Sequence, residues 1–263
     1  MKANSITHLF PWAALGLVLV GAPTLAAADE APATAEVAEE PGSSVELAVS
    51  ANTAIATDYV FRGLPQYSRP APSSQSTVGL GVSGVGPGTL SLSVWNATAM
   101  IPRKEDVRVE IDLTVSYDLQ LTDALGLGMG YVGYFYPLAQ VRADVGHELF
   151  LTAGYDLGVL SSFAGIYVDP FLMKSVYATA GVTRDFGAGP VTVTPTASLG
   201  LAGGGGGAYF NDLTLALAAT WAVVDPLYLS LSGSFSYLGD PDPVLSFDDR
   251  TSTYMMLTAG IDL

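Results

Sequence analysis

Residues 107–119 read VRVEIDLTVSYDL, and their apolar and polar side chains alternate over thirteen successive positions without an error. Successive side chains of a β-strand point to opposite faces, so this stretch predicts a strand with one apolar and one polar face. The same period of two recurs in LYLSLSGSFSY (227–237), VTVTPTASLGL (191–201) and LGLGMGYVGYF (125–135). The alternation starts near Val45 and predicts an all-β chain from there onward.

Twelve segments carry this pattern, and they are 46–62, 75–84, 88–97, 107–119, 124–136, 147–157, 159–168, 174–185, 190–201, 211–222, 226–238 and 252–263. Long connections alternate with short turns between them, and the long ones are 63–74, 98–106, 137–146, 169–173, 202–210 and 239–251. Outer-membrane barrels show this alternation, because their short turns face the periplasm and their long loops face outside. We therefore predict a closed, antiparallel, up-and-down transmembrane β-barrel of about 12 strands over residues 45–263, with both termini periplasmic.

The composition favours a chain that meets lipid and excludes several partners. Mean hydropathy is +0.39, and only 13% of the 263 residues are charged, against about 25% in ordinary soluble domains. The 25 Asp and Glu outnumber the 10 Lys and Arg, so we expect no nucleic-acid partner, which would need clustered cations. The chain has no cysteine and therefore no disulfide, thiolate metal site or cysteine nucleophile. We predict no cofactor.

The first 44 residues are expected to lie outside the barrel. Residues 1–28, MKANSITHLFPWAALGLVLVGAPTLAAA, have a basic start, an apolar stretch at 12–22 and an Ala-rich cleavage site, which predicts a secretory signal peptide. The apolar stretch is shorter than the ~20 residues that cross a bilayer as a helix. Residues 29–44 are rich in Ala, Glu and Pro and predict a disordered acidic periplasmic linker.

A secreted lipocalin-like or sandwich protein is the soluble alternative, and it would turn the apolar face inward. Two observations favour the membrane barrel instead. The polar face carries Gly, Ser, Thr and several charges, which suits a wet lumen. Aromatic residues near the predicted strand ends on the apolar face suggest a girdle at the membrane interfaces, and they are Tyr59, Tyr131, Tyr155, Trp221 and Tyr237.

The end of the first predicted strand carries a family resemblance. Residues 57–63, TDYVFRG, resemble the S/T-D-Y-V-F-R-G opening of the TorF family of predicted porins. Further matches follow in order, and they are Trp95-Asn96, VEIDL (109–113), GYVGYFYP (130–137) and HELF (147–150). The resemblance covers residues 46–201, and it implies an outer-membrane barrel with a channel function. Barrels of this kind often end on Phe or Trp, whereas this chain ends on Leu263.

An outer-membrane barrel has predictable partners. We expect outer-membrane lipid, lipopolysaccharide and the barrel-assembly machinery to contact this chain. Charged residues on the polar face are then expected to line the lumen, and they are Asp58, Arg62, Arg108, Glu110, Asp112, Asp118, Glu148 and Asp156. They form either a charged constriction that filters solutes or an ion-paired plug that fills the barrel. The excess of acid predicts a mild preference for cations.

Other motifs have a structural and a functional interpretation. Gly126, Gly128 and Gly130 on the polar face either leave room for neighbouring charged side chains or relieve crowding between strands. His147 is the single histidine after the predicted cleavage site, and its parity places it outward, away from Glu148, which argues against an outer-membrane hydrolase. Four aspartates in loop 239–251 either bind a divalent ion or form an acidic solvated loop, and they are Asp240, Asp242, Asp248 and Asp249.

The sequence therefore predicts a non-enzymatic outer-membrane barrel without a catalytic or metal site. Its predicted function is passive diffusion of small solutes or ions through a narrow charged lumen. A non-conducting structural barrel is the alternative, and a hydrolase is less favoured.

Overall fold

The computed structural model describes residues 45–67, 69–84, 86–102, 109–138, 146–171, 174–204, 207–239 and 250–263. Its long strands are β1 (Glu46–Ala56), β4 (Ser73–Ser83), β5 (Gly88–Ala99), β6 (Val109–Gln120), β7 (Leu125–Phe135), β8 (Gly146–Asp156), β9 (Ser161–Asp169), β10 (Ser175–Thr183), β12 (Val191–Gly204), β13 (Gly207–Val224), β14 (Leu227–Leu238) and β15 (Thr251–Asp262). The short strands are β2 (Val60–Phe61), β3 (Leu64–Pro65) and β11 (Phe186–Ala188). The predicted signal peptide and linker (1–44), Arg108 and the aspartates of 240–249 lie outside the described residues.

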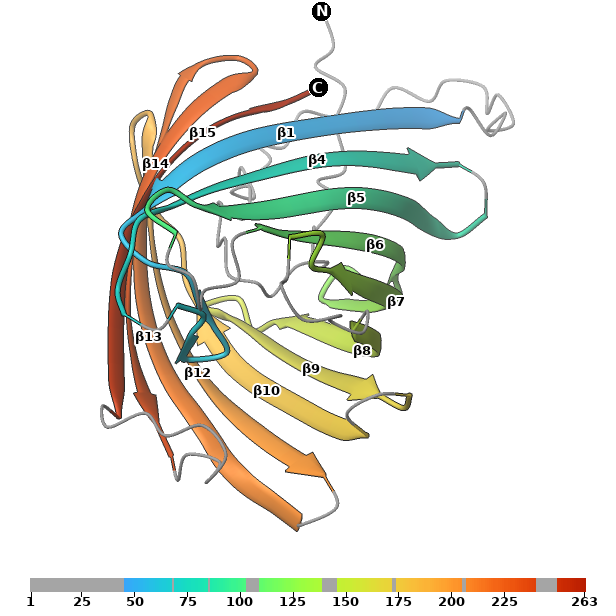
Figure 1. Cartoon of the computed structure of the whole chain (residues 1–263). Helices are drawn as coiled ribbons and strands as arrows, with labels where there is room; N and C mark the ends of the chain where they lie inside the picture. The colour runs from blue at the N-terminus through green and yellow to red at the C-terminus, as the bar shows by residue number, and fades with distance from the viewer. Residues whose placement is uncertain are drawn as a thin grey trace, which may run out of the picture.

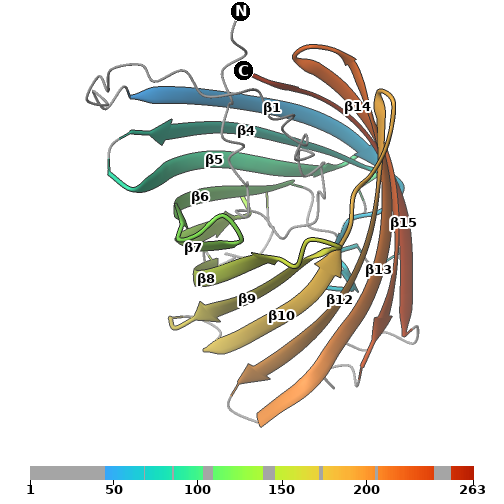
Figure 2. The same cartoon turned by 180° about the vertical axis from the view of Figure 1, so that it is seen from behind.

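The twelve long strands close into one antiparallel barrel. Chain neighbours pair in order from β4 to β10 and from β12 to β15, and β1 pairs with both β4 and β15. Pairing between β10 and β12 completes the ring (Figures 1 and 2). The short strand β11 pairs alongside the first residues of β12. The predicted closed, up-and-down barrel of about 12 strands is thus confirmed. The described residues include no helix that is long and apolar enough to cross a membrane.

The strand alternation sorts side chains onto two faces of the barrel. Large apolar residues point outward and are exposed, among them Leu80, Leu92, Val115, Met129, Leu151, Leu199, Leu215, Leu231 and Leu257. Polar residues on the other face are buried in the interior, among them Thr114, Ser116, Thr152, Thr179, Thr196, Thr214, Ser230 and Thr258. A closed ladder satisfies every strand's backbone internally, and an apolar exterior then suits hydrocarbon surroundings.

Two predicted boundaries are wrong. The long connection predicted at 202–210 is mostly strand, because β12 runs to Gly204 and β13 starts at Gly207. The first strand ends at Ala56 rather than at 62. The described residues of 57–72, called the inner segment below, leave the wall and fold into the barrel, where they form the β2–β3 hairpin. The Asp58 carboxylate accepts the backbone N–H of Tyr59 at 2.8 Å and that of Ala71 at 3.5 Å, which ties the two ends of the segment together. The hairpin turns at Arg62 and Gly63, where φ is +51° and +78°.

The inner segment also corrects the predicted girdle. Tyr59 does not face lipid but is buried inside the barrel, and Phe61 is half-buried there as well. Of the other predicted girdle residues, Tyr155, Trp221 and Tyr237 are exposed, and Tyr131 is half-buried beside His147. The alternation of DYVFR continues that of the strand before it, so parity alone could not reveal the turn at Asp58.

Glycines on the lumen side lie beneath larger side chains. A Cβ at Gly130 would meet the ring of Phe150, and one at Gly128 would meet the carboxylate of Asp118. The interpretation that these glycines leave room for neighbouring side chains is therefore favoured over general relief of crowding. The Phe150 ring and the Asp118 side chain lie over these glycines and fill part of the lumen.

The same arrangement gives a stability prediction at Gly181, whose Cβ would meet both the Phe163 ring and the Ala197 carbonyl oxygen. We expect Gly181→Ala to destabilise the folded barrel by about 1–3 kcal/mol, because overpacking must displace a ring or a strand. Urea titration of the barrel in lipid vesicles measures the change. Gly187→Ala is the matched control, because nothing lies within 4 Å of its Cβ position. Equal stability of the two variants would contradict this account of the glycines.

Candidate functional site

The inner segment packs first against the wall formed by β5. The Tyr59 ring lies 5.4 Å from that of Trp95 and 6.1 Å from that of Tyr67, measured between ring centroids. Ala71, Ala97 and Ala99 complete this buried cluster. Small alanines on the wall leave space for the aromatic rings, so the segment is held by tight apolar contact as well as by hydrogen bonds.

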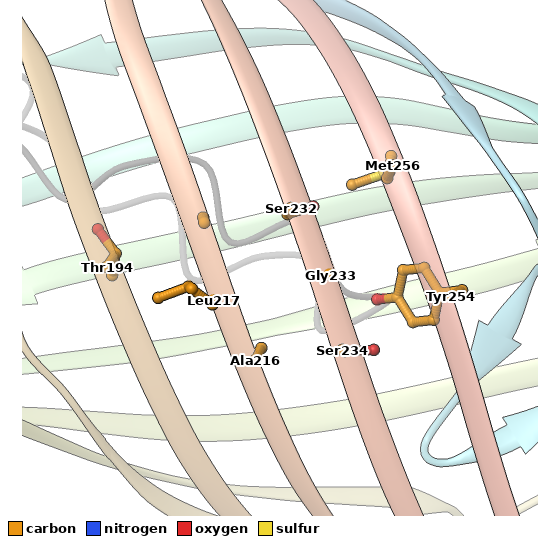
Figure 3. A pocket seen from close by; sticks show the side chains of 9 residues that line it. Thr194, Ala216, Leu217, Ser232, Gly233, Ser234, Tyr254 and Met256 are labelled. Carbon is orange, nitrogen blue, oxygen red and sulfur yellow. The ribbon is translucent and has the colours of Figure 1, made fainter.

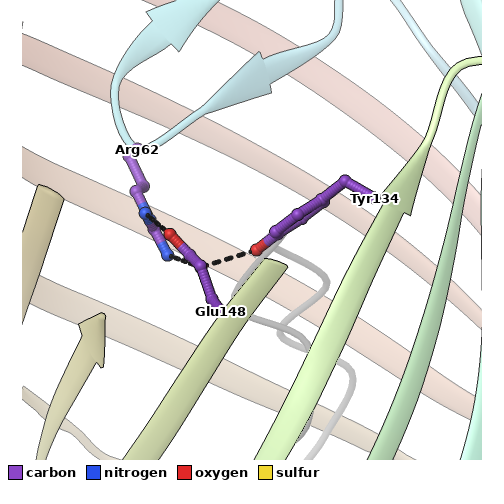
Figure 4. A network of polar contacts seen from close by, with 3 residues as sticks. All are labelled: Arg62, Tyr134 and Glu148. Atoms are coloured by element: carbon purple, nitrogen blue, oxygen red, sulfur yellow. Dashed lines mark hydrogen bonds and ion pairs between the residues drawn. The ribbon is translucent and has the colours of Figure 1, made fainter. Parts of the chain in front are cut away.

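Arg62, at the tip of the hairpin, binds the opposite carboxylate on β8. Its Nη1 and Nη2 atoms donate to the two carboxylate oxygens of Glu148 at 2.8 and 2.7 Å (Figure 4). The hydroxyl of Tyr134, on β7, donates to the same carboxylate at 2.7 Å. A bidentate guanidinium–carboxylate pair fixes orientation as well as distance, and this one is largely buried.

Aromatic rings surround the same guanidinium. Its Cζ lies 4.6 Å from the ring centroid of Phe61, 4.9 Å from that of Tyr167 and 4.3 Å from that of Tyr177. These distances are within the range of cation–π attraction. Burial alone lowers the pKa of Arg62, but the hydrogen bonds and charge of Glu148 outweigh it and raise the pKa above its ordinary value. Arg62 therefore stays charged and held in place.

The tip of the segment also reaches the wall formed by β13 to β15. Asn211 donates its side-chain N–H to the Arg62 carbonyl at 2.9 Å, and the Ser252 hydroxyl donates to the Gly63 carbonyl at 3.0 Å. Val60 packs with Tyr254 and with other buried apolar residues of β1 and β15. The inner segment thus contacts several sides of the barrel and crosses its interior.

Two acidic residues on β6 lie near the segment without a cation in contact among the described residues. Glu110 is buried and accepts the Tyr136 hydroxyl at 3.3 Å. Asp112 has one buried carboxylate oxygen that accepts no hydrogen bond. Because Arg62 is bound to Glu148, these two acidic side chains have no cation partner among the described residues.

The other predicted lumen residues lie elsewhere along the wall. Asp118, also on β6, accepts the Ser116 hydroxyl at 3.1 Å. Asp156, at the end of β8, accepts the backbone N–H of Gly158 at 2.7 Å in the turn that follows. These two residues are therefore not part of the cluster around the inner segment.

Sequence reasoning missed several residues that hold the segment, namely Tyr134, Tyr167, Tyr177, Asn211 and Ser252. The alternation along their strands predicts that most of these side chains point into the barrel. Their contacts depend on where a non-strand segment lies inside the barrel, and no local pattern in the sequence carries that information.

A small hollow lies on the wall of β12 to β15 (Figure 3). Its lining is uncharged, and the residues are Thr194, Ala216, Leu217, Ala218, Ser232, Gly233, Ser234, Tyr254 and Met256. The buried hydroxyls of Ser234 and Tyr254 have no hydrogen-bond partner. A water molecule would satisfy both groups, so the lining of this hollow is uncharged, in contrast to the acidic part of the wall on β6.

His147 lies on the outer face as predicted. Its Nδ1 shares a hydrogen bond with the hydroxyl of Tyr131, and Phe171 packs edge-on against its ring. Glu148, the next residue, is buried with Arg62 in the lumen. The two side chains point to opposite faces of the sheet, which does not support their action as a catalytic pair. Within the described ranges, no group of three or more His, Asp or Glu could hold a metal ion.

Part of the chain matches a known protein family in sequence. Residues 38–159 match a family described as a bacterial protein of unknown function (Gcw_chp). No curated protein matches the chain in sequence. The TorF assignment therefore stays a prediction.

Solved porins share the architecture at low sequence identity. The KdgM porin has a TM-score of 0.54 at 10% identity, covering 81% of this chain and 98% of that chain. A structure of KdgM porin in complex with disordered oligogalacturonate gives 0.52 at 10% identity, over 81% and 98% of the two chains. The NanC porin gives 0.50 at 8% identity, over 82% and 100%. These similarities define the fold as a porin-like β-barrel.

Proposed function

We propose that this chain is an outer-membrane porin-like channel of the TorF type, through which small solutes or ions diffuse passively. Both termini lie in the periplasm in this proposal, and the long loops face outside. The inner segment then enters from the outer side and narrows the passage. The observation that carries the proposal is the hairpin held inside a twelve-strand barrel by the Arg62–Glu148 pair.

The two interpretations of the lumen charges apply to different residues. Arg62 and Glu148 are an ion pair that fixes the inner segment, as a plug would require. Glu110 and Asp112 are acidic side chains of the lumen wall that contact no described cation, as a selective constriction would require. We infer a narrow passage that favours cations and neutral solutes. An acidic ligand such as the oligogalacturonate of the KdgM complex fits this lumen poorly, because Arg62 is already bound.

Planar-bilayer recording of the purified protein tests the proposal. We expect discrete conductance steps that are small compared with those of open porins of ~16–18 strands. Liposome swelling with neutral sugars of increasing size would give the cutoff of the passage. If a protein that is heat-modifiable on a gel gives neither steps nor swelling, the channel is refuted and the non-conducting structural barrel replaces it.

Charge selectivity should depend on Asp112. We expect Asp112→Asn to bring the cation-to-anion permeability ratio closer to one, because it removes an acidic group that has no described cation partner from the lumen wall. Reversal potentials in a KCl gradient give the ratio. Asp225→Asn is the matched control, because Asp225 is exposed in the turn before β14 and changes the net charge equally. If both variants keep the parent ratio, Asp112 does not contribute to selectivity.

A further inference from the structure

The outer face of the barrel carries a polar row where a spanning surface should be apolar. Thr53 of β1 pairs with Ser76 of β4, and Ser76 pairs with Asn96 of β5. All three side chains point outward, because their strand neighbours Ala54, Gln75 and Trp95 are buried inside. Ser74 and Thr98, the next outward pair, continue the row into a patch of five polar residues. We call these five residues the outer polar patch.

Strand length places this patch against lipid. A tilted transmembrane strand needs ~9–11 residues to cross the bilayer core. The whole of β4 has 11 residues, and β5 has 12. If Ser76 and Asn96 lay beyond the hydrocarbon, the outward apolar side chains of β4 would be only Val78, Leu80 and Val82. A band of three apolar side chains is too short to cross the bilayer core, so part of the patch faces the acyl chains.

The hydrogen bonds of the patch are incomplete. Ser76 donates to the Thr53 hydroxyl at 3.0 Å, and Thr53 donates to the Gln75 carbonyl at 3.5 Å. The carboxamide of Asn96 makes no hydrogen bond to the part of the chain that the structure describes. An amide that faces hydrocarbon with two donors and an acceptor unsatisfied is strongly unfavourable.

We propose that the outer polar patch binds a second copy of this chain, with Asn96 near a two-fold axis. A carboxamide is self-complementary, because it both donates and accepts, so two copies of Asn96 satisfy each other across an isologous interface. The small Ser and Thr side chains around it let two barrel walls approach closely, and polar groups strengthen association in lipid. No lipid tail offers a hydrogen-bonding group at this depth.

The proposal also accounts for the Trp95-Asn96 motif. Trp95 faces inward and packs against Tyr59 of the inner segment. Asn96 faces outward into the patch. One dipeptide therefore anchors the constriction on one face of the wall and forms the subunit contact on the other.

Cross-linking in native outer membranes tests the interface, since the parent chain has no cysteine. We expect Asn96→Cys to form a disulfide-linked dimer several-fold more efficiently than Leu217→Cys. Leu217 is the matched control, because it is 54% exposed on the outer face of β13, away from the patch. A dimer yield at Asn96 no higher than at Leu217 would overturn the proposal.

A second variant tests whether the Asn96 carboxamide itself holds the two copies together, rather than only lying near the contact. Asn96→Leu should shift the purified protein in mild detergent from dimer to monomer by light scattering, while heat-modifiability shows that the barrel stays folded. A parent protein that is monomeric, and that retains lipopolysaccharide in a way that Asn96→Leu abolishes, would instead assign the patch to a lipid headgroup and refute the protein contact.

Discussion

Arg62→Ala should raise the single-channel conductance several-fold. The substitution removes the bidentate contact to Glu148 and the charge that Phe61, Tyr167 and Tyr177 surround. Breaking a buried ion pair from one side costs about 3–5 kcal/mol, because it leaves the other charge uncompensated. The inner segment is held at its tip by this pair, so we expect the tip to leave the lumen and the passage to widen. Planar-bilayer recording measures the change directly.

The control for this experiment lies in the same segment. Arg69 is exposed, and Arg69→Ala changes the net charge equally without touching Glu148. We expect its conductance to match that of the parent. The double variant Arg62→Ala with Glu148→Ala also removes the orphaned carboxylate, and it should stay as conductive as the single variant. Parent-like conductance in both Arg62 variants, with the barrel intact on a gel, would show that the segment does not set the aperture.

Leu257→Arg should impair insertion of the barrel into lipid. Leu257 lies midway along β15, points outward and is 57% exposed. An arginine at the bilayer midplane of a barrel wall costs about 2–4 kcal/mol, whereas an exposed leucine of a soluble protein accepts arginine without loss. Folding into vesicles, followed by urea titration, measures the free energy of unfolding for both proteins.

A rim position provides the comparison for this charge. Val45 is also 57% exposed but lies just before the first strand, at the rim, where an arginine costs about 0–1 kcal/mol. Val45→Arg should therefore fold almost as the parent does. If Leu257→Arg is equally well tolerated, the outer face of β15 does not meet hydrocarbon, and the soluble alternative regains support.

Much of the fold could be predicted because a strand with one apolar and one polar surrounding carries alternating apolar and polar residues. The alternation in VRVEIDLTVSYDL gave both the existence of β6 and the face on which Glu110 and Asp112 lie. The end of β1 could not be obtained in the same way. DYVFR keeps the parity of a strand, and the turn at Asp58 depends on a contact with Ala71, thirteen residues away.

The candidate site was predictable only as a set of residues. Parity placed Arg62 and Glu148 on the polar face, but they are 86 residues apart in the chain, and their pairing follows from the position of the hairpin inside the ring. The support from Asn211 and Ser252 has the same origin. Register within a sheet can be derived from pattern, whereas the path of an irregular segment through an enclosed space requires the three-dimensional arrangement.

The inner segment also contacts the seam of the barrel, where the first strand pairs with the last. The barrel closes where the earliest strand, β1, joins the last, β15, and bringing ends so far apart in sequence together is entropically unfavourable. The segment starts directly after β1, and it binds β15 through the Ser252 hydroxyl and through Val60 beside Tyr254. The docked hairpin therefore links the two strands of that seam from within the barrel.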